Sequence, residues 1–206
     1  MQTKQKQLFV LCVLAIGLVA LWLEPGGRLR GRLRGEAFFQ GYPVHYWQRQ
    51  LQSSDPVVIE TTRAELAAGR RSASEVLRTL LVARSTANWD TSTSRCAAAE
   101  ILTAIGEEAA EAGADVISAL SDSDVYLRRI AAGAVPAVGV PASQGIPALL
   151  DLLQRERSVE VLRALSEYGG EAQPALTELS KVLRDRSLPT EIRWNAARTI
   201  GKVREN

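Results

Sequence analysis

A short helical pattern recurs along most of this chain, and this internal repeat limits the possible folds more than any other feature. Residues 94–106 (SRCAAAEILTAIG) align with residues 127–139 (LRRIAAGAVPAVG), and the glycines that end them lie 33 residues apart. Weaker copies cover residues 57–69, 158–169 and 192–203. A period of ~30–34 residues is typical of arrays in which each unit packs mainly on its neighbours.

The copies have the apolar spacing of a helix. One continuous stripe at i, i+3, i+4, i+7, i+8 and i+11 is formed by Leu127, Ile130, Ala131, Ala134, Val135 and Val138. Further helical segments lie between the copies, at 73–84, 114–124, 146–158 and 173–187. Convincing strand patterns are missing. We therefore expect an all-α fold, an α-solenoid of about five helical hairpins over residues 41–206.

The residues between the helices fit this interpretation. Pro147 is expected at a helix start, where its missing N–H costs nothing. Asp122 and Asp124 precede a helix and can accept hydrogen bonds from its free N–H groups. Three glycines are expected to end helices with a positive φ: Gly106, Gly139 and Gly169.

Residues 121–139 (SDSDVYLRRIAAGAVPAVG) resemble the HEAT-repeat pattern, in which an aspartate in the turn precedes an arginine and an alanine-rich helix. The resemblance covers roughly residues 43–204 and implies a protein–protein interaction scaffold without catalytic residues. It also implies structural repeat positions, which are Asp122, Arg95, Arg128, Arg193 and Pro147. Each of these arginines is expected to hold a turn carboxylate, because ordered arginine–carboxylate pairs suit repeat-to-repeat fixing; ligand binding is the alternative.

The N-terminal segment predicts a membrane anchor or a secretion signal. Residues 8–23 carry no charge, and two lysines precede them. We expect a signal anchor or signal peptide over residues 1–24 and a Gly/Arg-rich linker over residues 25–40. This layout resembles bacterial membrane-anchored HEAT-repeat proteins and implies a single-pass protein with its repeats on the exported side of the cell envelope. The linker arginines slightly favour the opposite orientation.

The stretch GYPVHYWQRQL (41–51) holds the only histidine of the chain and three aromatic residues. Val44, Trp47 and Leu51 share one helical face, and His45 is expected to point away from it into solvent. The first unit of an array has no predecessor to cover its apolar side. We therefore interpret the stretch as an N-terminal cap made of Tyr42, Pro43, Tyr46 and Trp47.

A second set of side chains lies opposite the apolar stripe. If these helices line the inner face, the rows would form a candidate partner face made of Glu100, Arg129, Arg163, Trp194 and Arg198. An exposed tryptophan beside an arginine is the composition of an interface hot spot. The alternative is that Trp194 packs on the C-terminal helix and covers the end of the array.

Motifs for chemistry are missing. The single histidine has no second ring beside it, and no nucleophile, phosphate-binding or metal-binding pattern occurs. A net charge of +2 gives no argument for nucleic acid. We therefore predict that the chain is not an enzyme. The leading function is a non-catalytic, membrane-tethered scaffold that docks a protein partner on its inner face, without cofactor, metal or small-molecule substrate.

Two alternatives remain open at this point. Some HEAT-like proteins resemble bilin lyases, which hold a tetrapyrrole. The first alternative is therefore a bilin-lyase-type enzyme. The other is a self-associating structural protein of the envelope.

Overall fold

The computed structural model describes residues 26–84 and 91–205, together with Cys12, Val13, Ala15, Gly17 and Val19. Helices account for almost all of the described elements. The N-terminal part contains α2 (Arg28–Leu33), β1 (Phe38–Phe39), β2 (Tyr42–Pro43), α3 (Val44–Leu51), α4 (Pro56–Ala68), η1 (Arg70–Ala73), α5 (Ser74–Leu81), α6 (Ser92–Ile105), η2 (Gly106–Ala112) and α7 (Gly113–Ala119). The remainder contains α8 (Val125–Ala137), α9 (Ala142–Arg155), α10 (Val159–Glu167), η3 (Gly169–Ala175), α11 (Leu176–Arg184) and α12 (Thr190–Arg204).

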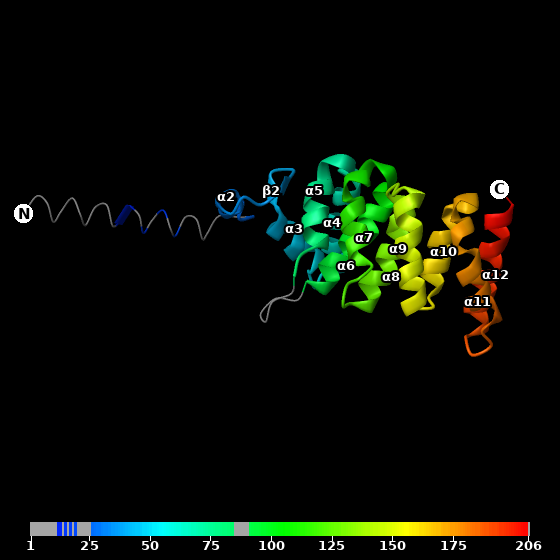
Figure 1. The fold of residues 1–206 in the computed structure, drawn as a ribbon. Helices are drawn as coiled ribbons and strands as arrows, with labels where there is room; N and C mark the ends of the chain where they lie inside the picture. The colour runs from blue at the N-terminus through cyan, green and yellow to red at the C-terminus, as the bar shows by residue number, and fades with distance from the viewer. Residues whose placement is uncertain are drawn as a thin grey trace, which may run out of the picture.

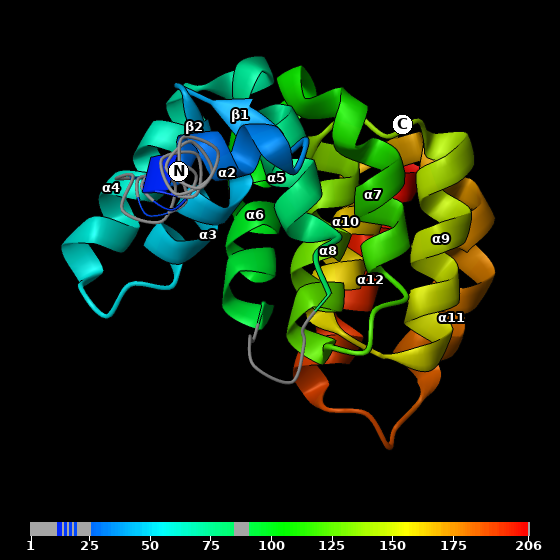
Figure 2. The same cartoon turned by 90° about the vertical axis from the view of Figure 1, so that its left-hand side faces the viewer.

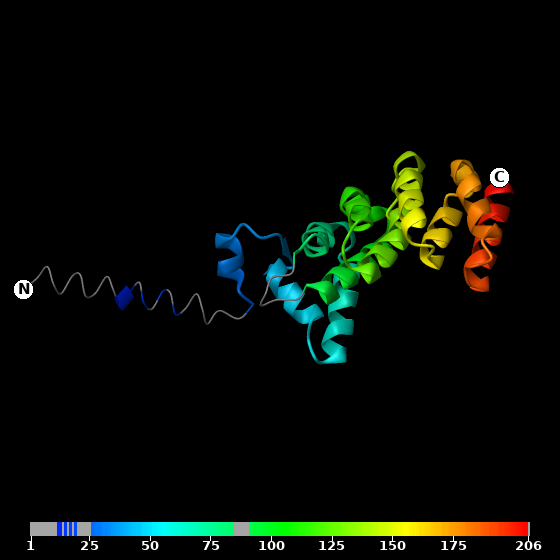
Figure 3. The same cartoon turned by 60° about the horizontal axis from the view of Figure 1, so that its bottom comes forward.

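The helices stack into two layers. In one layer α4, α6, α8, α10 and α12 pack each on the next. The other layer holds α5, α7, α9 and α11, which pack against α6, α8, α10 and α12. Figures 1 and 3 show the helices following one another from α3 to α12, and Figure 2 views the stack from its N-terminal end. This is the HEAT-like helical architecture expected from the repeat.

The equivalent apolar positions of the repeats form the core between the layers. Ala98 and Leu102 of α6 are fully buried, as are Ala131 and Val135 of α8. Alanine at these positions lets neighbouring helices approach closely at little entropic cost. Because no unit has enough large apolar residues for its own core, each is stabilised by the units on either side.

The helix ends follow the expected turn chemistry. Asp124 caps α8, because its side chain accepts hydrogen bonds from the backbone N–H groups of Tyr126 and Leu127. The glycines predicted to end helices do have positive φ, with values of 74° at Gly106, 76° at Gly139 and 53° at Gly169.

Pro147 differs from its predicted place at a helix start. It lies inside α9, which begins at Ala142 directly after Pro141. The sequence alignment placed the start too late because Pro141 is the proline that precedes this helix. Pro147 therefore removes one backbone donor from the helix itself.

The segment expected to be a linker, residues 25–40, is partly folded onto the array. It contains α2 and β1, and β1 pairs antiparallel with β2 through Phe39 and Tyr42. The two residues between the strands, Gln40 and Gly41, have φ of 50° and 78°. Positive φ at both turn positions matches the twist of a tight hairpin, which a search for longer strand runs does not detect.

The membrane assignments need correction. Within the described residues no helix is long and apolar enough to cross a membrane. The membrane-anchored, exported-side location predicted from the sequence is therefore withdrawn. The apolar run on which it rested, residues 8–23, lies almost wholly outside the described part of the chain.

Candidate functional site

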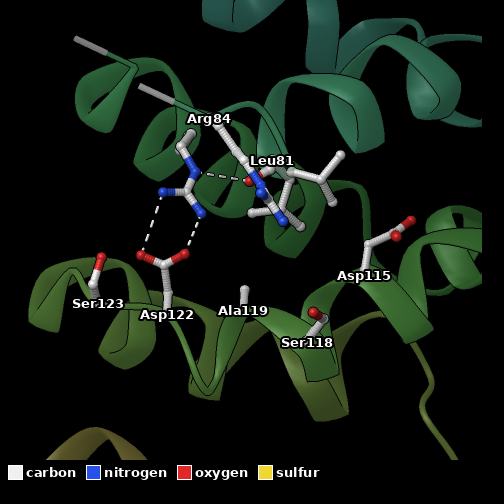
Figure 4. A pocket seen from close by; sticks show the side chains of 9 residues that line it. Leu81, Arg84, Asp115, Ser118, Ala119, Asp122 and Ser123 are labelled. Carbon is white, nitrogen blue, oxygen red and sulfur yellow. Dashed lines mark hydrogen bonds and ion pairs between the residues drawn. The ribbon is translucent and has the colours of Figure 1, made fainter. Parts of the chain in front are cut away.

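A pocket of about 500 Å³ lies between the first two repeats. Figure 4 shows Arg84 and Leu81 on one wall, and Asp115, Ser118, Ala119, Asp122 and Ser123 along the other. The first wall follows the end of α5, and the second runs along α7 and the turn after it. Pockets of ~300–1,000 Å³ are the usual size for small ligands.

Arg95 fixes the shape of this pocket. It projects from the first turn of α6, and its Nε donates to the Leu81 carbonyl at 3.0 Å. Its Nη1 lies 3.3 Å from Oδ1 of Asp122, and a second contact makes the pair bidentate. The arginine therefore ties α5, α6 and the turn after α7 to one another.

Asp122 is held as a carboxylate. Burial would raise the pKa of its side chain, but the hydrogen bond from Arg95 and a 2.9 Å bond from the Asp124 N–H outweigh it, so that the pKa lies below its usual value. Asp122 is consequently ionised at neutral pH and neutralises Arg95.

One positive charge of the pocket is left over. The carboxylate of Asp115 is bound by Arg78, whose Nε lies 2.6 Å from Oδ2. Both pocket carboxylates are thus paired within the protein, whereas Arg84 is exposed and has no ion-pair partner in the described part of the chain. A guanidinium beside a polar pocket is suited to a carboxylate or phosphate of a ligand.

Sequence reasoning did not find Arg84, Asp115 or Ser118. Arg84 ends the expected helix 73–84 and resembles the other exposed arginines of the chain. The pairing of Asp115 with Arg78, 37 residues earlier, spans about one repeat plus one helical turn and is the one signal that could have indicated this junction. Among the described residues, no group of three or more His, Cys, Asp or Glu side chains could hold a metal ion.

The predicted arginine positions have different partners. Arg95 pairs with Asp122, and Arg128 pairs with Glu156 while its Nη1 donates to the Asp122 carbonyl at 2.6 Å. Among the described residues, Arg193 donates one hydrogen bond, to the hydroxyl of Thr190 at 3.4 Å, and forms no ion pair. The expected turn carboxylate is therefore found at Arg95 and Arg128, but not at Arg193 within the described residues.

The candidate partner face lies on a single layer. Its members project from α6, α8, α10 and α12, but Glu100 is bound by Arg63 of α4, and Arg129 lies 3.7 Å from Glu156. Trp194 is 59% exposed, so it does not pack on the end of the array as the alternative required. Two face residues, Arg163 and Arg198, line a shared hollow between α10 and α12.

The aromatic stretch is buried at the N-terminal end of the stack. Trp47 is 1% exposed, and its Nε1 donates to the carbonyls of Phe39 and Tyr42 at 3.3 and 3.2 Å. The rings of Tyr42 and Tyr46 stack with centroids 4.1 Å apart. Pro43 lies in β2 and directly precedes α3.

His45 is not exposed as expected. It is half-buried, and its Nδ1 lies 2.7 Å from Oε2 of Glu36. The sequence prediction was wrong because it treated the segment that carries Glu36 as a solvated linker, whereas the β1–β2 hairpin folds that segment back over α3.

No protein-family model and no curated protein matches the chain. A solved structure does: the complex of CpcE and CpcF of phycocyanin lyase from Nostoc sp. PCC7120. The match has a TM-score of 0.59 and 22% identity, and covers 83% of this chain and 68% of the other. At this identity the likeness shows the fold, a HEAT-like helical array.

This match corrects the prediction that the chain is not an enzyme. That prediction took a helical-repeat fold without catalytic motifs as evidence for a scaffold. The matching structure is the complex of a lyase, so the fold occurs in an enzyme and gives no ground for excluding enzymatic activity.

Proposed function

We propose that this chain is a bilin-lyase-type protein, which binds a tetrapyrrole and works together with a second protein subunit. The observation that carries the proposal is the shared fold, which extends over 83% of the chain. The matching structure is a complex of two subunits, CpcE and CpcF. Among the functions considered from the sequence, this one agrees best with that match.

The pocket between the first two repeats supports this proposal. Tetrapyrroles carry carboxylate side chains, and Arg84 offers the unpaired cation that such a group would need. The hydroxyls of Ser118 and Ser123 supply further hydrogen-bonding groups beside it. The Arg95–Asp122 pair would keep the pocket open by fixing its two walls.

A titration with biliverdin, a linear tetrapyrrole, tests the proposal. We expect the full chain to bind biliverdin with a change in its visible absorbance, and Arg84→Ala to weaken binding by about tenfold or more, because a charge-assisted hydrogen bond contributes ~1.5–3 kcal/mol. The matched control is Arg186→Ala, which removes an exposed arginine in the turn before α12.

The control variant should bind as the original chain does. An unchanged spectrum at every biliverdin concentration would contradict the proposed function. Equal losses in the two variants would contradict the assignment of Arg84.

A further inference from the structure

Another hollow of the surface lies at the C-terminal end of the stack, between α10 and α12. Its volume is about 170 Å³. It is lined by Arg163, Ser166, Glu167, Asn195, Arg198, Thr199 and Lys202. Three of these side chains are cationic and one is a carboxylic acid, whose pKa is raised by burial although Lys202 acts to lower it. The hollow therefore has an excess of positive charge.

Near the N-terminal end of the same layer, an arginine that faces the neighbouring helix is neutralised by a carboxylate of that helix. There Arg63 of α4 forms an ion pair with Glu100 of α6. The repeat alignment places Arg163 and Arg198 at the positions that correspond to Glu100. Arginine thus stands in place of glutamate on both α10 and α12, and the two guanidinium groups line the same hollow. Like charges in such an arrangement repel each other unless an anion lies between them.

Neither arginine has an internal carboxylate. Within the described residues no ion pair involves Arg163 or Arg198, and both side chains are exposed. By contrast, three arginines at the junction of the first two repeats form ion pairs, Arg70 with Glu108, Arg71 with Glu111 and Arg78 with Asp115. Among the described residues, the unpaired arginines at the α10–α12 junction therefore differ from those at the junction of the first two repeats that form ion pairs.

An exposed aromatic ring extends this surface. Trp194 lies one turn before Arg198 on α12, and the Arg198 guanidinium sits 5.7 Å from the ring centroid. Contact with the ring orders the arginine at the rim of the hollow. Tryptophan and arginine are also among the residues most enriched at the energetic centres of protein interfaces.

We propose that the α10–α12 hollow docks an acidic segment of a protein partner, with Asp or Glu carboxylates bound by Arg163 and Arg198 and an apolar contact on Trp194. Charge complementarity favours this occupant, because the carboxylates would bind these arginines as Glu100 binds Arg63 nearer the N-terminal end of the same layer. The hollow is separate from the pocket of Arg84, so the proposal does not depend on tetrapyrrole binding.

Fluorescence anisotropy with a labelled hexaglutamate peptide tests the proposal on the full chain. At low salt, where charges act over ~10 Å or more, we expect Arg163→Gln with Arg198→Gln to weaken peptide binding roughly fivefold or more. The matched control is Arg184→Gln with Arg186→Gln, which removes the same charge from exposed positions at the end of α11 and just after it. The control and the Arg84→Ala variant should both bind the peptide as the original chain does.

Three results would overturn the proposal. One is the absence of peptide binding, and another is an equal loss in the target and control variants, which would show that only net charge matters. The third is tighter binding of a labelled hexathymidine oligonucleotide than of the peptide, if the Arg163→Gln, Arg198→Gln variant loses this oligonucleotide binding. That result would assign the hollow to phosphates instead of carboxylates. Failure of biliverdin binding leaves all these readouts unaffected.

Discussion

Arg95 and Arg193 occupy the same place in their repeats, yet only Arg95 holds a carboxylate. Arg95 reaches Asp122, which belongs to the turn after the next helix. Arg193 lies in α12, and within the described residues its side chain donates to the hydroxyl of Thr190 and forms no ion pair. A repeat pattern in the sequence thus predicts which arginine positions recur, but it does not predict which group each arginine contacts in the folded chain.

Trp47 gives a prediction for a single residue. Its ring is buried under β1 and β2, and both hydrogen-bond acceptors of its Nε1 are backbone carbonyls of this hairpin. Trp47→Ala should lower the free energy of unfolding by about 3–5 kcal/mol, the range for removal of a large buried aromatic side chain. Urea denaturation followed by circular dichroism measures this loss.

Trp194→Ala provides the comparison for this variant. The side chain of Trp194 is largely exposed, so its removal should change the free energy of unfolding by less than about 0.5 kcal/mol. Similar stabilities of the Trp47 and Trp194 variants would contradict the interpretation of Trp47 as the cover of the first repeat.

Among the helical elements, α6 has the most clearly defined end. Gly106 follows its last residue with φ 74° and ψ −146°, a conformation that residues with a Cβ rarely adopt. Gly106→Ala should therefore destabilise the array by about 1–3 kcal/mol. Thermal or urea unfolding of the variant measures the effect.

The matched control for this helix end is Gly133→Ala. Gly133 lies within α8, has no positive φ, and a Cβ there would meet open space. The substitution should leave stability unchanged or raise it by up to ~1 kcal/mol, because alanine favours the helix. A loss at position 133 as large as that at position 106 would contradict the assigned role of Gly106.

The sequence predicts the elements of the array better than those before it. The recurring apolar stripe located α6, α8 and α12, and the glycines expected to end helices lie just after α6 and α8. The β1–β2 hairpin was missed because each strand has two residues and no periodic pattern can form over that length. The helix α2 was missed because its glycines and arginines resemble a solvated linker, although Gly31 packs closely on Pro43.

At the scale of the whole molecule, the two ends of the stack differ in charge pairing. Four ion pairs join the first repeat to the second, between residues 37 to 40 positions apart in the chain. Exposed pairs of this kind contribute little stability individually. Their regular spacing instead favours one register of the first two repeats, whereas Arg163 and Arg198, between α10 and α12, form no ion pair within the described residues.

The candidate pocket was only partly predictable. Arg95 and Asp122 were identified from the repeat pattern as structural positions, with each repeat arginine expected to hold a turn carboxylate, and the structure places both in the pocket wall. Arg84 could not be distinguished from other exposed arginines, because its significance depends on which carboxylates its neighbours have already bound. Which carboxylates are already paired becomes known only when the side chains of α5, α6 and α7 are placed in the folded structure.

Hydrogen–deuterium exchange of the full chain with and without biliverdin tests the central claim most directly. The account predicts slower exchange on ligand addition in the end of α5, the start of α6, α7 and the turn at Asp122, with no change in α10 and α12. Arg84→Ala should remove this protection. No protection on addition of biliverdin, or protection confined to the C-terminal repeats, would contradict the proposed ligand pocket.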